Sequence, residues 1–283
     1  MDEQPEAFSY GEAPDLYVEY RRRSEPFTMA EDHYHDYYEI YYMLSGQRVY
    51  FIRDRSYSVE QGDLIFINKH ELHKTMQAGD SAHERVILHF DDAVLARLAG
   101  DRADFLLAPF RQQSNLIRLP SQALMPAEQA IRRLVSEIGQ RQEGYELVPG
   151  CVLIELLLTV SRHLIQHGQP PLHIATPMHV KISEVIRYIN AHYEEPLRLG
   201  TLAERFFISP YYLSRMFKEM SGFTFSDYIV LTRVKEAQRL LRETDLSITD
   251  VAAAVGFDNF SHFGKTFKKI THVSPREYRK QYG

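Results

Sequence analysis

The residues best suited to binding chemistry form a short cluster of histidines and one acid in the first quarter of the chain. His33, His35 and Glu39 lie within seven positions of one another, and His73 follows later. Three imidazoles and a carboxylate offer the nitrogen and oxygen donors that Fe, Mn, Ni or Zn accept. The same groups can hydrogen-bond a polar small molecule in a pocket. The residue types alone leave both kinds of site open.

A second group of candidate residues lies in a repeat near the C-terminus. The sequence YLSRMFKEMSGFTFSDY at 212–228 aligns with HFGKTFKKITHVSPREY at 262–278, at an offset of 50 residues. Helical periodicity points one face of each copy inward, namely Leu213, Met216, Phe217 and Met220, and then Phe260, Phe263, Phe267 and Ile270. The other face carries groups that donate to phosphates and base edges. We expect DNA contacts from Ser209, Tyr211, Tyr212, Ser214, Arg215, Lys218, Asn259, Ser261, His262, Lys265 and Lys268.

Each copy is expected to form a helix-turn-helix unit whose second helix enters the major groove. Ser209 can cap that helix in the first copy, since a serine hydroxyl accepts from a free backbone N–H. In the turn, Phe207 stands where the second copy has Gly256, and His272 stands where the first copy has Gly222. We expect a slightly strained left-handed turn at His272 and intact function, because histidine tolerates that conformation better than most side chains.

The elements around the histidine cluster are predicted to be short strands. Runs rich in Tyr, Val, Ile and Phe are separated by turn residues, at 38–44, 47–53, 57–59, 63–67 and 85–90. Short strands at this spacing indicate a barrel or a sandwich. The periodicity then becomes helical near 92–110, 122–142 and 147–167. Residues 1–30 are polar with scattered aromatics, which predicts an arm without regular structure.

Two resemblances now become specific. The segment 33–46 resembles the first cupin motif, and 62–73 resembles the second, although Asn68 and His70 replace a usual proline and glycine. The last hundred residues resemble the DNA-binding domain of the AraC/XylS family of transcription regulators. That resemblance implies two helix-turn-helix units joined by a long helix, here at about 225–243. We therefore predict an α+β chain of two domains, a cupin-like β-barrel with helices followed by an all-α double helix-turn-helix.

The resemblance also bears on the histidine cluster. Sensor barrels of AraC-type regulators commonly keep these polar positions without a metal, so we expect a ligand pocket. Its expected residues are His33, His35, Glu39, Tyr41 and His73. No cofactor is expected, and a metal held by the three histidines and Glu39 is the alternative. His70 and His89 are interpreted as structural histidines at strand ends. Sugars are the commonest effectors that the resemblance implies, and tyrosines suit stacking on sugar rings.

Charge and composition divide the chain in the same way. Its 283 residues carry a formal charge of -5, split into +4 over 180–283 and −9 over the rest. A basic module joined to an acidic one is the asymmetry expected of a DNA-binding half. The expected domains are a sensing and dimerisation domain at 1–168, a linker at 169–179 and a DNA-binding domain at 180–283.

The remaining signals concern partners and compartment. Cys151 is the only cysteine, which favours a reducing compartment and is interpreted as packing. An acidic N-terminus without an apolar core predicts no signal peptide, and no run reaches the length of a membrane span. The apolar helix at 147–167 predicts a homodimer, with Leu156, Leu157 and Val160 in the interface. We therefore expect a cytoplasmic, non-enzymatic regulator that binds double-stranded DNA and a small-molecule effector. The alternative is a metal-dependent cupin enzyme with a helical appendage.

Overall fold

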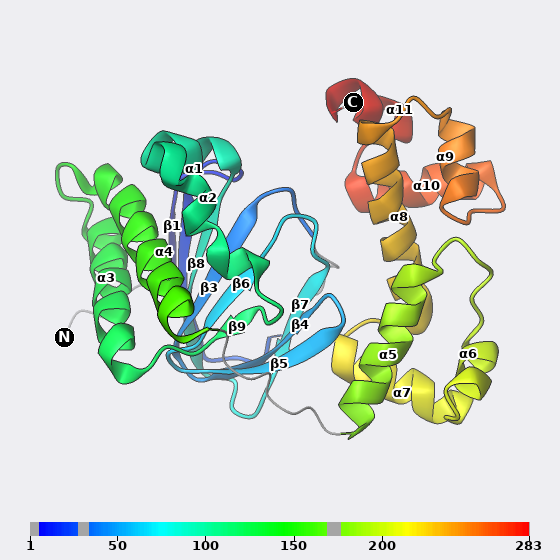
Figure 1. Cartoon of the computed structure of the whole chain (residues 1–283), viewed down its shortest axis with the longest axis horizontal. Helices are drawn as coiled ribbons and strands as arrows, with labels where there is room; N and C mark the ends of the chain where they lie inside the picture. Colours follow the sequence, from blue (N-terminus) through cyan, green and yellow to red (C-terminus); the bar gives the residue numbers. More distant parts are fainter. Residues whose placement is uncertain (1–5, 28–33, 169–176, 283) are drawn as a thin grey trace. The chain divides into compact units, whose positions relative to one another are not determined.

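The structure, a computed structural model, describes residues 6–27, 34–168 and 177–282. The chain divides into two compact units, Met1–Ile174 and Ala175–Gly283. The first unit is built on β-sheets with helices, and the regular elements of the second, over residues 177–282, are all helices (Figure 1). The predicted α+β class, with a sheet-rich first half and an all-helical second half, is therefore confirmed.

Two antiparallel sheets form the first unit. The larger sheet has the order β1 (Ala7–Tyr10), β2 (Tyr17–Arg23), β8 (His83–Phe90), β3 (Tyr38–Ser45), β6 (Leu64–Ile67) and β9 (Leu116–Ile117). The smaller sheet has the order β5 (Arg55–Glu60), β4 (Gln47–Ile52) and β7 (His73–Gln77). Their inner faces share an apolar cluster to which Tyr41 and Ile87 contribute from one sheet and Tyr50 and Ile52 from the other. The two sheets therefore pack face to face.

The expected arm over residues 1–30 is wrong for its described part, because β1 and β2 extend the larger sheet. β2 pairs with β8 from Tyr17 to Arg23, and Val18 and Tyr20 are buried on one face of it. The strand was missed because its other face carries charged residues. β7 was missed for the same reason, since its residues HKTMQ are mostly polar.

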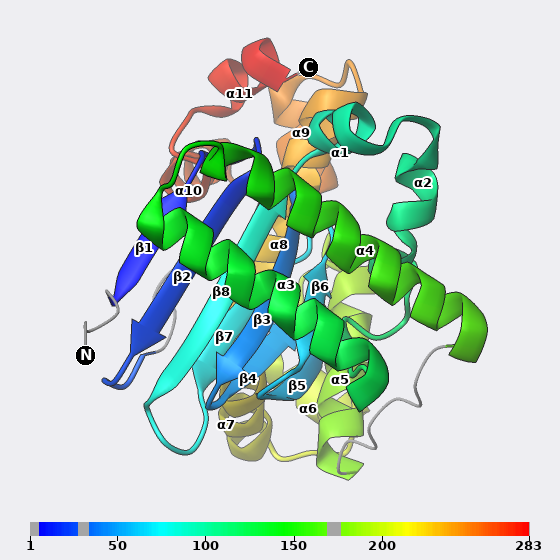
Figure 2. The ribbon, with the colours of Figure 1, turned by 90° about the vertical axis from the view of Figure 1, so that its left-hand side faces the viewer.

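Helices cover the outer face of the larger sheet (Figure 2). They are α1 (Asp92–Ala99), α2 (Ala103–Leu106), α3 (Ser121–Gln140) and α4 (Val148–His167), with short 3-10 turns η1 (Gly100–Arg102), η2 (Ala108–Arg111) and η3 (Tyr145–Leu147). One apolar core joins residues of β2, β3 and β8 to residues of α3 and α4. This packing buries one face of the long apolar helix that the sequence predicts.

The residues that α4 buries and exposes differ from those that the sequence predicts. Leu156, Leu157 and Val160 are buried in the core of their own unit, so they cannot form a subunit interface. Cys151, interpreted as packing, is exposed. By length and mean hydropathy the segment Tyr145–His167 could cross a membrane, against the expectation that no segment could, but half of the apolar window is buried. A core helix of a folded unit has that property too.

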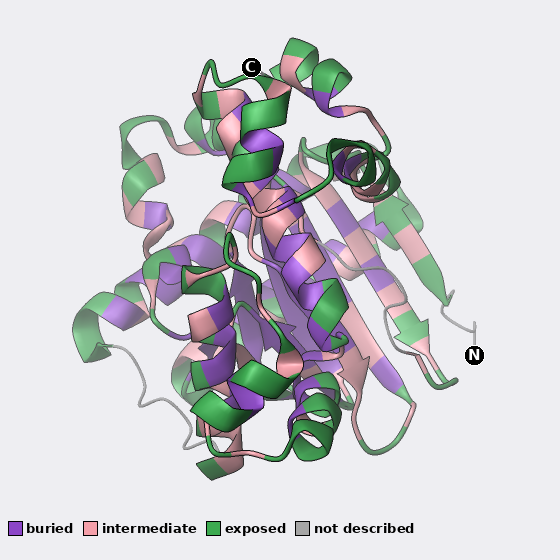
Figure 3. Cartoon of the chain, turned by 90° about the vertical axis from the view of Figure 1, so that its right-hand side faces the viewer, coloured by how far each residue is buried: buried purple, intermediate pink, exposed green. Residues whose placement is uncertain are grey.

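The second unit contains two similar groups of helices. They are α5 (Pro177–Ala191), α6 (Leu199–Arg205), α7 (Pro210–Ser221), α8 (Phe225–Glu243), α9 (Ile248–Ala254), α10 (Phe260–Thr271) and α11 (Pro275–Tyr282). Figure 3 shows buried stripes alternating with exposed residues along these helices. The single helix α8 serves both groups, because Tyr228 packs against Phe217 while Val234 and Leu241 belong to the second core. α5 begins at Pro177, inside the expected linker, and residues 169–176 lie outside the described ranges.

Candidate functional site

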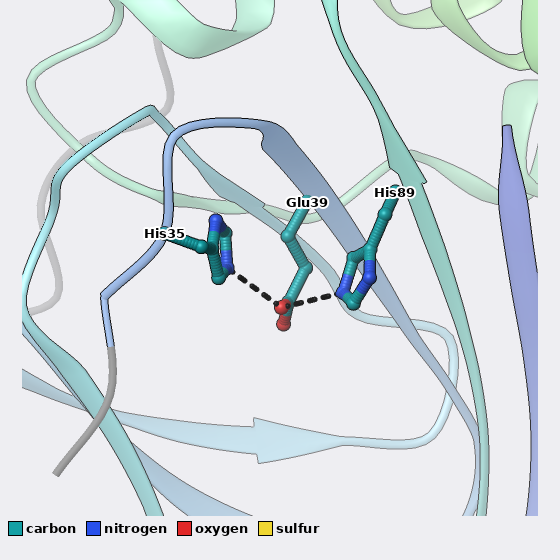
Figure 4. A group of neighbouring side chains, drawn as sticks. All are labelled: His35, Glu39 and His89. Atoms are coloured by element: carbon teal, nitrogen blue, oxygen red, sulfur yellow. Dashed lines mark hydrogen bonds and ion pairs between the residues drawn. The ribbon is translucent and has the colours of Figure 1, made fainter. Parts of the chain in front are cut away.

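The first candidate site surrounds one buried carboxylate on the inner face of β3. Oε2 of Glu39 lies 3.0 Å from Nε2 of His89 and 3.3 Å from Nε2 of His35 (Figure 4). The same oxygen lies 3.9 Å from Nε2 of His73. Its other oxygen accepts a hydrogen bond of 3.0 Å from the Tyr50 hydroxyl. Glu39 is only 2% exposed. One negative charge is therefore held inside the unit by three imidazoles and a phenol.

Backbone carbonyls orient two of the three imidazoles. Nδ1 of His35 lies 2.8 Å from the Tyr37 carbonyl oxygen, and Nδ1 of His73 lies 2.8 Å from that of Glu71. A carbonyl only accepts, so Nδ1 carries a proton in both rings and donates it. The Nε2 atoms of both rings face Oε2 of Glu39, and a ring donates to that oxygen only when it carries a second proton. This arrangement is typical of a binding site and exceeds what packing requires.

The electrostatics favour an ionised carboxylate at the centre. Burial raises the pKa of Glu39, but hydrogen bonds from His35 and His89 and the charge of His73 outweigh it and hold that pKa well below its usual range. Burial and the Glu39 charge together raise the pKa of the Tyr50 hydroxyl well above its usual range. Burial raises the pKa of Tyr41 to about 12. The carboxylate thus stays charged, and the phenols stay neutral donors.

The structure brings together three of the five residues expected in the ligand pocket. His35, Glu39 and His73 meet around one oxygen, whereas His33 lies outside the described residues. His35 reaches the cluster from the segment that precedes β3, since that strand begins at Tyr38. Tyr41 faces the same interior one layer further along the strand, with its ring 5.1 Å from that of Tyr50.

His89 is the member of the cluster that the sequence analysis missed. It was interpreted as structural, but it is the direct register partner of Glu39 across the β3–β8 pair. Alternation along β8 places Arg85, Ile87 and His89 on one face. That signal was present in the sequence, although it becomes useful only once β8 is known to pair with β3. Tyr17, on the next strand, stacks on His89 with 5.3 Å between ring centroids.

The chemistry of this donor set would fit a metal. One ligand atom each from His35, Glu39 and His89 lie within 4.8 Å of one another. Two imidazoles and a carboxylate suit Zn²⁺, Fe²⁺ or a similar divalent ion. They would hold it from the segment before β3, from β3 and from β8, with the Tyr37 carbonyl orienting the His35 ring. The same three donors would equally hydrogen-bond the hydroxyl groups of a small molecule.

The second candidate site consists of the outward faces of α7 and α10. Ser209 caps α7 by accepting from the Tyr212 amide, and Asn259 caps α10 by accepting from the His262 amide. All eleven residues expected to contact DNA are exposed. Leu213 and Phe217 form the buried stripe of α7, as expected, together with the Met220 side chain. Caps and stripes of this kind fix which face of each helix is available to a partner.

Arg215, Lys218 and Tyr211 line a shallow hollow on α7 together with Ser214 and Glu219. One inward assignment on α10 is wrong: Phe260, the first residue of the helix, is 51% exposed.

The turns of the two helix-turn-helix units share a backbone hydrogen bond and a left-handed residue, but that residue is Phe207 in the first unit and Gly256 in the second. The Phe207 amide donates to the Glu204 carbonyl, as the Gly256 amide donates to that of Ala253. Both residues are left-handed, with φ of 54° and 83°. His272 ends α10 with φ of 63°, which confirms the expected left-handed turn there.

Comparisons with known proteins agree with this geometry. Residues 14–157 match the AraC-like ligand binding domain, and residues 202–281 match a helix-turn-helix domain. The chain is 25% identical over 261 residues to the transcriptional activator RhaR of Cronobacter sakazakii, covering 91% of this chain and 89% of RhaR. It is 25% identical over 276 residues to the activator RhaS of Salmonella paratyphi B, covering 96% and 94%.

Among solved structures, ToxT from Vibrio cholerae is 14% identical, covers 95% of this chain and 99% of its own, and has a TM-score of 0.39. The match to the AraC-like ligand binding domain alone spans half of the chain. The helix-turn-helix match covers both repeated units. The chain belongs to the AraC family of transcription regulators.

Proposed function

We propose that this protein is an effector-controlled regulator that binds specific DNA sequences through α7 and α10. The observation that carries the proposal is the pair of capped helices with exposed Arg, Lys, Ser, His and Tyr residues on one face. Arg215 and Lys265 are the side chains proposed to reach base edges or phosphates. Two such helices held by one scaffold would enter successive major grooves, roughly 34 Å apart.

The effector site is proposed to be the cluster around Glu39. His35, His73, His89 and Tyr50 present donors from four different elements, which is how a pocket fixes the orientation of a polar ligand. A sugar or a related metabolite would satisfy these donors through its hydroxyl groups. Such a molecule can alter transcription only by binding the DNA-competent arrangement more tightly than the other arrangement. RhaR and RhaS are named transcriptional activators, and we propose activation here as well.

The remaining parts of the proposal concern assembly, catalysis and compartment. The outer face of α4 carries Cys151, Leu158 and Ile165, of which Ile165 is 67% exposed. We place a homodimer contact on this face. We propose no catalytic role, because a cupin enzyme would leave the two helix-turn-helix units unexplained. A cytoplasmic location follows from the function as a DNA-binding regulator.

The decisive experiment is selection of DNA from a random-sequence library with the full chain, followed by titration of a selected duplex. Specific binding should weaken steeply with salt, because phosphate contacts release counterions. The same duplex titrated in the presence of a panel of sugars, and of Zn²⁺ or Mn²⁺ alone, identifies the effector. Failure to enrich any sequence would contradict the DNA-binding proposal. A divalent ion that changes affinity would favour the metal alternative for the Glu39 cluster.

A further inference from the structure

A second polar group lies on the inner face of the larger sheet, one layer beyond the Glu39 cluster. In the β3–β8 pair, Glu39 faces His89, Tyr41 faces Ile87, and Met43 faces Arg85. The apolar pair in the middle therefore separates His89 from Arg85 along β8. In the β2–β8 pair, Arg21 lies directly opposite Arg85, and Arg23 lies opposite His83. Like charges placed directly across an antiparallel pair repel each other.

The smaller sheet adds another arginine to this group. Arg48 of β4 is 1% exposed. Its Nη1 donates to Oε1 of Gln77 over 2.8 Å, its Nη2 to the Phe27 carbonyl over 2.6 Å, and its Nε to Oγ1 of Thr75 over 3.3 Å. All three acceptors are neutral. Burying a guanidinium against neutral acceptors leaves its charge uncompensated, which is costly in the absence of an anion.

The side chains of Arg23 and Arg48 converge on one aromatic ring. Cζ of Arg23 lies 3.7 Å from the centroid of the Phe27 ring, and Cζ of Arg48 lies 5.6 Å from it. Nη1 of Arg85 and Nε of Arg23 are buried without a hydrogen-bond partner among the described residues. Two buried N–H donors of the arginines therefore have no acceptor among the described residues.

A single glutamate balances part of this charge. Oε1 of Glu19 lies 2.7 Å from Nη2 of Arg85 and 2.8 Å from Nε of Arg21. Burial lowers the pKa of Arg23, and the charges of Arg21 and Arg85 lower it further. The described contacts thus pair Glu19 with Arg21 and Arg85 and leave the positive charge in excess.

We propose that Arg23, Arg48 and Arg85 bind the oxyanion group, a carboxylate or a phosphate, of a small metabolite. The inference deepens the proposed function and rests on it, because it names the chemical class of the effector. Guanidinium groups present paired N–H donors that match the oxygens of either anion. An anion here would satisfy the free Nη1 of Arg85 and offset the repulsion between arginines. The effector would then be an acidic molecule, such as a sugar acid or a sugar phosphate, in place of a neutral sugar.

The test uses thermal unfolding and calorimetric titration of the full chain at constant ionic strength. The probes are matched pairs, galactose with galacturonate and glucose with glucose 6-phosphate, together with inorganic phosphate. In the wild-type chain, at least one acidic probe should raise the unfolding temperature and bind, whereas its neutral partner should bind more weakly. Galacturonate and glucose 6-phosphate separate the carboxylate from the phosphate, and inorganic phosphate tests the oxyanion alone.

Substitutions of single arginines test whether the anion binds to this group. Arg85→Gln and, independently, Arg23→Gln should each weaken binding of the acidic probe roughly tenfold or more, since each removes a charged donor. Without a ligand Arg23→Gln should unfold no earlier than wild type, because it relieves like-charge repulsion. Arg85→Gln also loses the ion pair with Glu19 and should unfold somewhat earlier. Arg22→Gln is the matched control: Arg22 lies between Arg21 and Arg23 on β2, and pairs with Glu84. It should bind the acidic probe as the wild type does.

Each remaining outcome decides the proposal. If the wild type and both glutamine variants bind the anion equally, the proposal is overturned. If an Arg215→Ala/Lys265→Ala variant loses anion binding instead, the anion binds at the recognition helices. Absence of binding by every acidic probe would also overturn it. A neutral sugar that alone changes DNA affinity would overturn this inference and leave the proposed function intact. Anion binding at the arginines without any change in DNA affinity would support the site and contradict its role as effector site.

Discussion

Nε2 of His89 donates to Oε2 of Glu39 over 3.0 Å, between register partners on neighbouring antiparallel strands. A carboxylate that is 2% exposed depends on such donors, because an unpaired buried charge is strongly disfavoured. The pair therefore joins β3 to β8 through side chains as well as through the backbone. It also places the charge of the cluster inside the sheet and not at a loop, which gives any ligand bound there a rigid frame.

Replacing that carboxylate should destabilise the first unit. Glu39→Gln retains the shape but removes the charge that accepts from His35, His89 and Tyr50. The expected loss in the free energy of unfolding is about 1–3 kcal/mol, measured by urea denaturation. Glu60→Gln, an exposed position on β5, is the control and should change stability little. A Glu39→Gln variant as stable as wild type would show that the cluster is not held together by this charge.

The recognition helices should tolerate loss of Arg215 in folding but not in DNA binding. Arg215→Ala should weaken specific binding by about 1–3 kcal/mol if the side chain reads a base edge. The side chain is exposed, and its ion pair with Glu219 is long at 3.8 Å, so the helix should keep its fold. Anisotropy titration with a selected duplex measures the effect. Arg133→Ala, an exposed arginine of α3 paired with Glu155, removes equal charge and should leave affinity unchanged.

The turn glycine of the second unit should resist substitution far more than a helix glycine nearby. A Cβ at Gly256 would lie 2.5 Å from the Glu194 carbonyl oxygen, on a residue with φ of 83°. Gly256→Ala should therefore lower the stability of the second unit by roughly 2–4 kcal/mol. Gly264→Ala, in α10 with nothing within 4 Å of its Cβ position, should raise it by about 0.5–1 kcal/mol. Thermal unfolding of both variants checks the contrast, and equal effects would contradict it.

The arginine group should make the first unit less stable in mild acid. Burial lowers the pKa of His83, and the charges of Arg48, Arg85 and Arg23 lower it further. The unfolded chain therefore binds the proton first. The contribution of His83 to stability is complete above the ordinary histidine pKa of about 6.5 and is lost as the pH drops below it. An oxyanion bound among the arginines should raise the pKa of His83. An NMR titration of the histidine ring protons, assigned with a His83→Asn variant, measures the pKa of His83 with and without the anion. An unchanged pKa on anion binding would contradict the expected rise.

The homodimer should depend on the exposed face of α4. Ile165→Glu should give a folded monomer, because it places a charge on an apolar contact without touching the core. Gln166→Glu, exposed at the next position, adds the same charge and should leave the dimer intact. Leu156→Glu should instead unfold the first unit, since that residue is fully buried. Sedimentation velocity at micromolar concentration distinguishes these outcomes, and a monomeric wild type would contradict the proposal.

Local patterns were enough to predict most of the fold. The capped helix from Pro210, the long helix from Phe225 and the strands with apolar alternation all have signals that depend on neighbouring residues only. β2 and β7 have none, because their inward faces are polar and their burial depends on the opposite sheet. The alternation Tyr17, Glu19, Arg21 becomes meaningful only when β8 is known to lie beside it.

The candidate sites divide in the same way. His35, Glu39 and His73 could be predicted, because they occupy ligand positions of the two cupin motifs that the segments 33–46 and 62–73 resemble. His89 and the arginines could not, because β-pairing brings them together from segments up to about sixty residues apart. Phe260 was assigned inward by periodicity alone, but the first residue of a helix has no preceding turn to pack against and remains exposed.

The continuous helix α8 has a consequence for the DNA that this protein can recognise. It contributes Tyr228 to one helix-turn-helix core and Val234 and Leu241 to the other. The two helix-turn-helix units are therefore held in one fixed orientation relative to each other. One extra residue in the middle of α8 would rotate the second unit by about 100° relative to the first. One extra base pair between the two recognised segments rotates them by only about a tenth of a turn. Insertions in the protein and in its binding site cannot therefore compensate one for one, and the spacing within each binding site should be invariant.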